Sequence, residues 1–89
     1  MSNEQILAVV RDELARLAPE IDFDSVDRTH SIQRAFDIDS TDFLNFITAL
    51  HERLGVDVPE SDYTRVATVD GALTYLSKHL EPKPGASPS

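Results

Sequence analysis

Residues 37–55, "DIDSTDFLNFITALHERLG", decide the fold because they contain one complete helix with both of its ends. Asp39 is a suitable N-cap, since its side chain can accept hydrogen bonds from the unpaired N–H groups of a first helical turn. Gly55 is a typical C-terminal stop. The apolar residues between them recur at helical spacing and form one face: Phe43, Phe46, Ile47, Leu50 and Leu54. The stretch therefore predicts an amphipathic helix over about residues 40–54.

Two further amphipathic helices are predicted, one on each side of this stretch. The first covers about residues 3–17, where Ser2 and Gln5 resemble a capping box. The last covers about residues 69–80, where Thr68 can cap the first turn and Gly71 weakens the helix somewhat. Their apolar faces are Ile6, Val9, Val10, Leu14 and Leu17 in the first helix, and Ala72, Leu73, Leu76 and Leu80 in the last.

The connections complete a predicted all-α domain. Residues 18–39 form an unusually long loop, and its scattered apolar side chains predict that it is pinned to the core, with a turn of helix within it. A short helix is expected at 59–66, with Pro59 at its first position. We predict a small four-helix bundle of three main helices and one short helix over residues 1–80. The Pro-, Gly- and Ser-rich tail at 81–89 is expected to be disordered.

The composition excludes several kinds of protein. The chain has 89 residues, enough for one small domain, and no cysteine for disulfides, thiolate metal sites or a cysteine nucleophile. A net charge of −8 disfavours nucleic acid and favours basic protein surfaces, although it also fits simple solubility. No apolar run is long enough to cross a bilayer, and the acidic N-terminus resembles no signal peptide. We expect a cytoplasmic monomer without membrane insertion.

A six-residue pattern, Asp-x-Asp-Ser-x-Asp, occurs twice, at 22–27 and at 37–42. Neither copy is a calcium-binding EF-hand loop, because both lack Gly at position six and Glu at position twelve. The chain has no G-x-S-x-G elbow and no glycine-rich phosphate loop. The three histidines are scattered and are expected at the surface. These absences predict a protein that is not an enzyme and holds no metal ion.

The residues that follow each copy distinguish its serine. After Asp27 the first copy continues with "RTHSIQR", which has no apolar helical stripe, whereas after Asp42 the second copy continues with the helix at 43–54. Ser40 is thus predicted in the first turn of a major helix, exposed just beyond its cap, and Ser25 in a loop. Position alone leaves open that Ser40 is only a first-turn residue.

Residues 36–76 resemble an acyl carrier protein. The family has an Asp-Ser-Leu motif opening its second helix, then an apolar helix, an Ile/Val-Pro pair before an acidic segment, and a Thr-Val cap on the last helix. The corresponding residues are Asp39-Ser40-Thr41, the stripe at 43–54, Val58-Pro59-Glu60 and Thr68-Val69. This correspondence runs without a gap over the whole segment.

The resemblance implies that Ser40 carries a 4′-phosphopantetheine arm, with Asp39 as part of the motif. A phosphopantetheinyl transferase would supply the arm from coenzyme A, and the arm's thiol would hold an acyl group as a thioester. The partners implied are acyl-transferring and acyl-modifying enzymes of fatty-acid, lipid or polyketide-type biosynthesis. The charge of a phosphodiester also suits a helix N-terminus, where free N–H groups favour anions.

Several residues depart from the family pattern. Thr41 stands where Leu or Met is usual, and Asp37 replaces a common Gly. On the second helix three positions that are often acidic are occupied by other residues: Asn45, His51 and Arg53. We expect a specialised carrier whose partners dock on one set of residues: Asp37, Thr41, Asp42, Phe43 and Glu52. For Phe43 a place in the core remains an equal alternative.

Three further interpretations stay open from the sequence. A helical docking module of carrier fold that is never loaded would also explain Thr41 and Asp37. A switch controlled by phosphorylation of Ser40 would use the same helix end. An aminoacyl or peptidyl carrier is less favoured, because the glycines that usually precede the serine in that class are missing.

Overall fold

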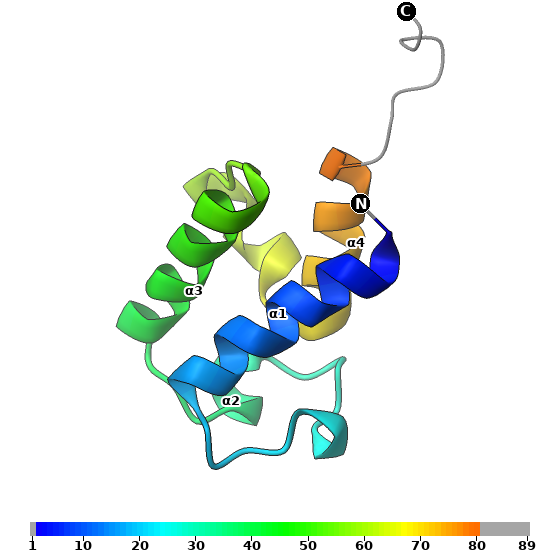
Figure 1. Ribbon diagram of the computed structural model, residues 1–89. Coiled ribbons are helices and arrows are strands. Elements are labelled where there is room, and N and C mark those ends of the chain that lie inside the picture. Colours follow the sequence, from blue (N-terminus) through cyan, green and yellow to red (C-terminus); the bar gives the residue numbers. More distant parts are fainter. Residues whose placement is uncertain (1, 81–89) are drawn as a thin grey trace, which may run out of the picture.

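The computed structural model describes residues 2–80, and the predicted disordered tail at 81–89 lies outside this range (Figure 1). Residues 2–80 contain no strand, which confirms the all-α prediction. The elements are α1 (Asn3–Leu17), η1 (Phe23–Ser25), α2 (Ile32–Ala35), α3 (Ser40–Leu54), η2 (Glu60–Val66) and α4 (Val69–Leu80). The two η segments are 3-10 helices.

The three long helices share one core, with α1 lying across both α3 and α4 (Figure 1). The predicted apolar faces supply most of this core, as expected for amphipathic helices that bury one stripe. Leu17, Leu73 and Leu80 are only partly buried at its edge. The fully enclosed large side chains come from every part of the domain: Ile6, Val10, Leu14, Ile32, Phe36, Phe46, Leu50, Val66, Val69 and Leu76.

The ends of α3 form as the sequence predicts. Asp39 Oδ1 accepts a hydrogen bond of 2.8 Å from the Asp42 N–H, which satisfies one of the free donors of the first turn. Gly55 has a φ of 72°, the left-handed conformation that glycine adopts without steric cost, and its N–H bonds the His51 carbonyl. The Asp39 cap fixes where α3 begins and therefore where Ser40 lies, and Gly55 fixes where the helix ends.

The long connection is pinned to the rest of the domain. Phe23, Ile32, Phe36 and Ile38 are buried, as predicted for the apolar residues of this loop. The backbone is also bonded to the segment before α4, because the Ile32 N–H donates to the Ala67 carbonyl at 2.7 Å. The connection is thus an ordered part of the fold, with η1 and α2 within it.

The segment from η2 to α4 contains two corrections to the sequence predictions. Pro59 is the extended residue before η2, not its first helical position, because its ψ of 157° is not helical. Gly71, expected only to weaken α4, is required by packing, since a Cβ there would lie 2.4 Å from the Arg65 carbonyl oxygen. A Cβ cannot approach a backbone oxygen this closely. Gly71 therefore allows η2 to pack against the start of α4.

Tyr75 provides a second link between η2 and α4. Its side chain is buried, although the apolar pattern did not include it, and its hydroxyl donates a 2.7 Å hydrogen bond to Asp62 Oδ2. Burial, then the bond to Asp62, raises the pKa of Tyr75 above its ordinary value. Together with Gly71, this bond fixes the position of η2 relative to the helices.

Candidate functional site

The two serines of the repeated pattern lie in different environments. Ser40 is the first residue of the fifteen-residue helix α3, and its side chain is exposed. Ser25 lies in the three-residue η1, where its hydroxyl donates a 2.9 Å hydrogen bond to Asp22 Oδ2. Ser40 combines an exposed hydroxyl with a long helix N-terminus, whereas the hydroxyl of Ser25 is already bonded within its own turn.

The residues predicted around Ser40 are only partly brought together. Asp37, Asp39 and Thr41 are exposed beside it, and Asp42 is half-buried in the first turn of α3. Glu52 is exposed near the other end of the helix, roughly 18 Å away at 1.5 Å per residue. Any surface that includes both ends must therefore extend along the whole of α3.

Asp37 has a backbone role that the sequence only hinted at. Its φ is 54°, which makes it the one residue other than glycine with a positive φ among residues 2–80. Side chains other than those of Gly, Asn and Asp tolerate this left-handed conformation poorly. The backbone of the turn into α3 thus has the conformation that suits Gly best, although this chain has Asp at that position.

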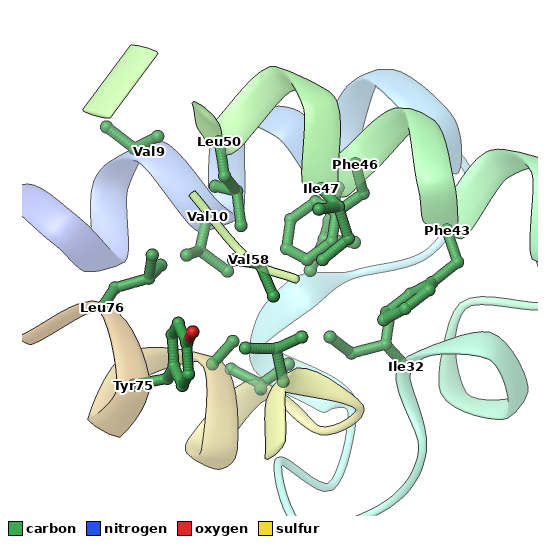
Figure 2. Close-up of a cluster of buried hydrophobic side chains, with 14 of the residues drawn as sticks. Val9, Val10, Ile32, Phe43, Phe46, Ile47, Leu50, Val58, Tyr75 and Leu76 are labelled. Carbon is green, nitrogen blue, oxygen red and sulfur yellow. The ribbon is translucent and has the colours of Figure 1, made fainter. Parts of the chain in front are cut away.

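Phe43 belongs to the core. It is 5% exposed, and Figure 2 shows its ring pointing from α3 toward Ile32. Its ring centroid lies 6.2 Å from that of Phe46 and 6.2 Å from that of Tyr63, the latter pair in an edge-to-face arrangement. Phe46 is also buried, so the core alternative for Phe43 is the correct one and Phe43 is not part of an exposed docking surface.

An open groove of about 380 Å³ lies beside Ser40. From α3 it is lined by Ser40, Phe43 and Leu44, and from η2 by Tyr63 and its neighbours. Ala67 and two polar residues of the α2 region complete the lining, whose one charged residue is Glu60. The groove therefore offers a mainly apolar surface directly next to the exposed serine.

Leu44 is a residue of this groove that the sequence reasoning missed. It is the only large hydrophobic residue of 2–80 that is clearly exposed, with 45% of its surface accessible. A signal was present, since Leu44 lies four residues after Ser40 and off the core stripe of α3. Residues four apart share one helical face, so Leu44 and Ser40 belong to the same surface.

Arg53 has a structural role as well as an effect on the net charge of α3. Its guanidinium donates hydrogen bonds to Glu13 Oε2 at 2.9 Å and to Asp12 Oδ2 at 2.8 Å, both on α1. These bonds raise the pKa of Arg53, with Glu13 the larger cause. Glu13 is itself buried, and a buried carboxylate requires a partner. Arg53 therefore joins α3 to α1, while Asn45 and His51 are exposed.

Other chemistries find little support in the described part of the chain. Within residues 2–80 no group of three or more His, Cys, Asp or Glu residues is arranged to hold a metal ion. No helix in this range is long and apolar enough to span a membrane.

Comparisons with known proteins point to one family. A family model described as the phosphopantetheine attachment site matches residues 4–76. The chain is 30% identical over 79 residues to an acyl carrier protein of Lactobacillus acidophilus, covering 89% of this chain and 98% of that protein. It is 32% identical over 80 residues to an acyl carrier protein of Renibacterium salmoninarum, covering 85% and 93% respectively.

The fold is also found in a solved structure. A solution structure from Anaplasma phagocytophilum, described as that of a candidate acyl carrier protein, has a TM-score of 0.76 and 23% identity. The similarity covers 93% of this chain and 97% of that one. The two chains thus share one small all-α fold.

Fold, family model and relatives together define a phosphopantetheine-binding carrier domain. The chain belongs to the acyl carrier protein family, as the sequence resemblance predicted. Members of this family are carriers rather than enzymes, and they work with enzymes that handle acyl groups. The prosthetic group that the family implies is phosphopantetheine, and an exposed serine hydroxyl is the kind of group to which it can be joined.

Proposed function

We propose that this protein carries an acyl group as a thioester on a 4′-phosphopantetheine arm attached to Ser40. The single observation that best supports the proposal is the exposure of the Ser40 hydroxyl at the start of α3. The other serine of the same local pattern, Ser25, is engaged by Asp22. The arm would supply a thiol at its free end, and partner enzymes would add, modify or remove the acyl group there.

Attachment requires one phosphoryl transfer at Ser40. The serine oxygen forms a bond to the phosphorus next to pantetheine in coenzyme A, and the bond from that phosphorus to the bridging oxygen of the pyrophosphate breaks. The nucleotide leaves as adenosine 3′,5′-bisphosphate, and the serine proton passes to a base of the transferase. On this chain, the unpaired N–H groups of the first turn of α3 stabilise the resulting phosphodiester anion.

Partner docking is proposed along α3. Asp39, Thr41 and Glu52 are exposed on or beside this helix, and Asp42 is half-buried in its first turn. The carboxylates would attract a transferase or an acyl-handling enzyme that presents basic residues. The partners would be acyl-handling enzymes of fatty-acid, lipid or polyketide-type biosynthesis.

Intact-mass measurement tests the attachment site. The wild-type chain, Ser25→Ala and Ser40→Ala would each be incubated with coenzyme A and a broad-specificity phosphopantetheinyl transferase. We expect one phosphopantetheine mass on the wild type and on Ser25→Ala, and none on Ser40→Ala. A wild-type chain that gains no mass would instead be an unloaded docking module. Gain that persists in Ser40→Ala would move the site elsewhere.

A further inference from the structure

A second groove lies between α1 and α4, away from Ser40. Its volume is about 400 Å³, and its apolar floor is made by Ile6 and Leu7 of α1 and Leu73 of α4. None of the residues that line this α1/α4 groove also lines the groove beside Ser40. In Figure 1 this part of α1 lies beside α4, on the other side of the domain from the start of α3. A molecule bound here would therefore leave the Ser40 hydroxyl accessible.

Hydrogen bonds hold the α1/α4 groove at both of its ends. At one end the Ser77 hydroxyl donates a 3.0 Å bond to Asn3 Oδ1, which joins the last turns of α4 to the start of α1. At the other end the Asp70 N–H donates to the Arg28 carbonyl at 3.1 Å, which places Arg28 beside the first turn of α4. The shape of the groove thus follows from the way these segments are joined.

Arg28 is the half-buried cation of this groove. Its guanidinium carbon lies 5.5 Å from the centroid of the Phe23 ring, a cation–π arrangement that orients the side chain. Arg11 lies over the same ring at 5.0 Å but is paired with Asp24. Arg28, by contrast, makes no ion pair with any residue of 2–80. A planar guanidinium binds a carboxylate through two parallel hydrogen bonds, so Arg28 is positioned to accept one from outside the chain.

The charges of the groove favour an acidic partner. Its lining contains two cations, Arg28 and Lys78, and one acidic residue, Glu4. This excess of positive charge is a local exception in a chain of net charge −8. Arg28 is bonded to Asp70, eight residues before Lys78 on α4, so the two cations are anchored roughly 12 Å apart along the groove at 1.5 Å per residue.

The floor between the two cations is apolar. Leu7 and Leu73 are partly buried against the core, and the surface that they leave exposed faces the groove. A helix laid along the groove repeats one face every two turns, about 11 Å, which is close to the spacing of the cations. The side chain one turn after the first also lies on that face. An acidic, apolar and acidic residue at successive turns would therefore match the order of charges and apolar surface in the groove.

We propose that the α1/α4 groove binds an acidic amphipathic helix of a partner protein. One carboxylate of that helix binds Arg28, a large apolar side chain packs on Leu7 and Leu73, and a second carboxylate lies near Lys78. A second copy of this chain fits less well, because two chains of net charge −8 repel each other. The partner differs from the basic enzymes proposed for α3, and it would hold the carrier while those enzymes reach Ser40. The proposal does not depend on attachment at Ser40.

Titration with two synthetic helical peptides tests the proposal. Both have roughly fifteen residues, enough for a helix of several turns. The acidic peptide has two glutamates two turns apart with a leucine between them, and the control peptide has lysines in place of the glutamates. Amide NMR spectra of the full chain would be recorded at about 0.15 M salt, which limits long-range attraction. We expect the acidic peptide alone to shift the Leu7, Leu73 and Thr74 signals, and to leave those of Ser40 and Leu44 unchanged.

Matched variants test the two cations. Arg28→Gln should weaken binding of the acidic peptide about tenfold, since a half-buried carboxylate contact is lost. Lys78→Gln should weaken it less than about fivefold, because Lys78 is exposed. Arg34→Gln makes the same change in charge at an exposed arginine that does not line the groove, and it should have no effect.

A charge exchange guards against a folding defect, because Arg28→Gln also removes the contact with Phe23. Lys78→Glu alters only an exposed side chain. It should weaken binding of the acidic peptide, and a peptide whose second glutamate is replaced by lysine should recover the affinity. Recovery requires the second carboxylate to lie near Lys78, so absence of recovery would contradict the proposed orientation of the helix.

Other results would overturn the proposal. Equal binding by Arg28→Gln and Arg34→Gln would remove Arg28 from the site, and equal shifts with the lysine peptide would remove the preference for acidic partners. Octanoate that shifts the groove signals through Arg28, where the acidic peptide does not, would assign the groove to a small amphipathic anion. Shifts of Leu7 and Leu73 that depend on the concentration of the chain alone would assign it to a second copy. Loading of Ser40, measured by intact mass, is unaffected by any of these results.

Discussion

The two copies of Asp-x-Asp-Ser-x-Asp have the same polar letters but begin helices at different positions. In the first copy Asp22 is the cap, accepting from the Asp24 N–H at 3.2 Å, and only the three-residue η1 follows. In the second copy the third residue, Asp39, is the cap, and the fifteen-residue α3 follows. A capping residue therefore determines where a helix can begin, but it does not determine how far the helix extends.

The residues after each copy explain the difference. Those after Asp42 place large apolar side chains on one face, and all of that face except half-buried Leu54 is enclosed in the core. Those after Asp27 form turns, and the Asp27 carboxylate accepts hydrogen bonds from the backbone and hydroxyl of Thr29. Tertiary burial supplies most of the stability of a protein helix, so only the second copy is extended into a long one.

The largest loss of stability is expected when a buried side chain of α3 is truncated. Phe46→Ala should lower the free energy of unfolding by about 3–5 kcal/mol, since Phe46 is 1% exposed and its loss leaves a cavity. Such a loss is a large part of the roughly 5–15 kcal/mol typical of native domains. Urea denaturation measures it. Val26→Ala, within the first copy and half-buried, should cost clearly less; an equal loss would contradict the special dependence of α3 on its core face.

The caps themselves give the next largest effect. Asp39→Ala should destabilise the domain by about 1 kcal/mol, because the Asp42 N–H loses its acceptor at the start of a long helix. Asp22→Ala should cost less, because the turn that it caps has only three residues. Thermal melts of the two variants provide the measurement. A greater loss for Asp22→Ala would show that the first copy has more structural importance than its short helix indicates.

Charge along α3, at Asp42 near Ser40 and at Glu52 near the other end, should affect loading more than stability. Asp42→Lys or Glu52→Lys should slow loading by the transferase at low salt by less than about fivefold, as exposed charges contribute only about 0.2–1 kcal/mol. The difference should shrink as salt rises. Glu20→Lys, which makes the same change in net charge on the connection before η1, is the control. If it slows loading equally, net charge rather than docking along α3 is responsible.

Replacing the first residue of each copy by Gly should give the smallest changes in stability, and the two changes should have opposite signs. Asp37→Gly should be neutral or stabilising by up to about 1 kcal/mol, because the native φ of 54° is tolerated by Asp at some cost and is free for Gly. Asp22→Gly should be destabilising, since Asp22 has an extended backbone and accepts two hydrogen bonds. Melting temperatures distinguish the two signs. Destabilisation by Asp37→Gly would indicate that its carboxylate has an additional structural role.

Local patterns were sufficient to predict the main elements. Helical spacing and caps predicted α1, α3 and α4 to within a residue, because both signals depend on neighbours in the chain. The same signals placed Ser40 at the start of α3. They could not place Phe43, whose position on a wide apolar stripe fits both a core residue and a surface one until its neighbour Tyr63 is known.

The sequence by itself thus determined the all-α class, the bounds of the long helices and the exposed serine at the N-terminus of α3. Only the tertiary structure decided that Gly71 is needed beside Arg65, that Arg53 pairs with buried Glu13, and that Phe43 packs against Tyr63 of η2. The reason is physical. Helix periodicity and capping arise from residues within a few positions of each other, whereas close packing and buried charge pairs join residues whose distance along the chain says nothing of their distance in space.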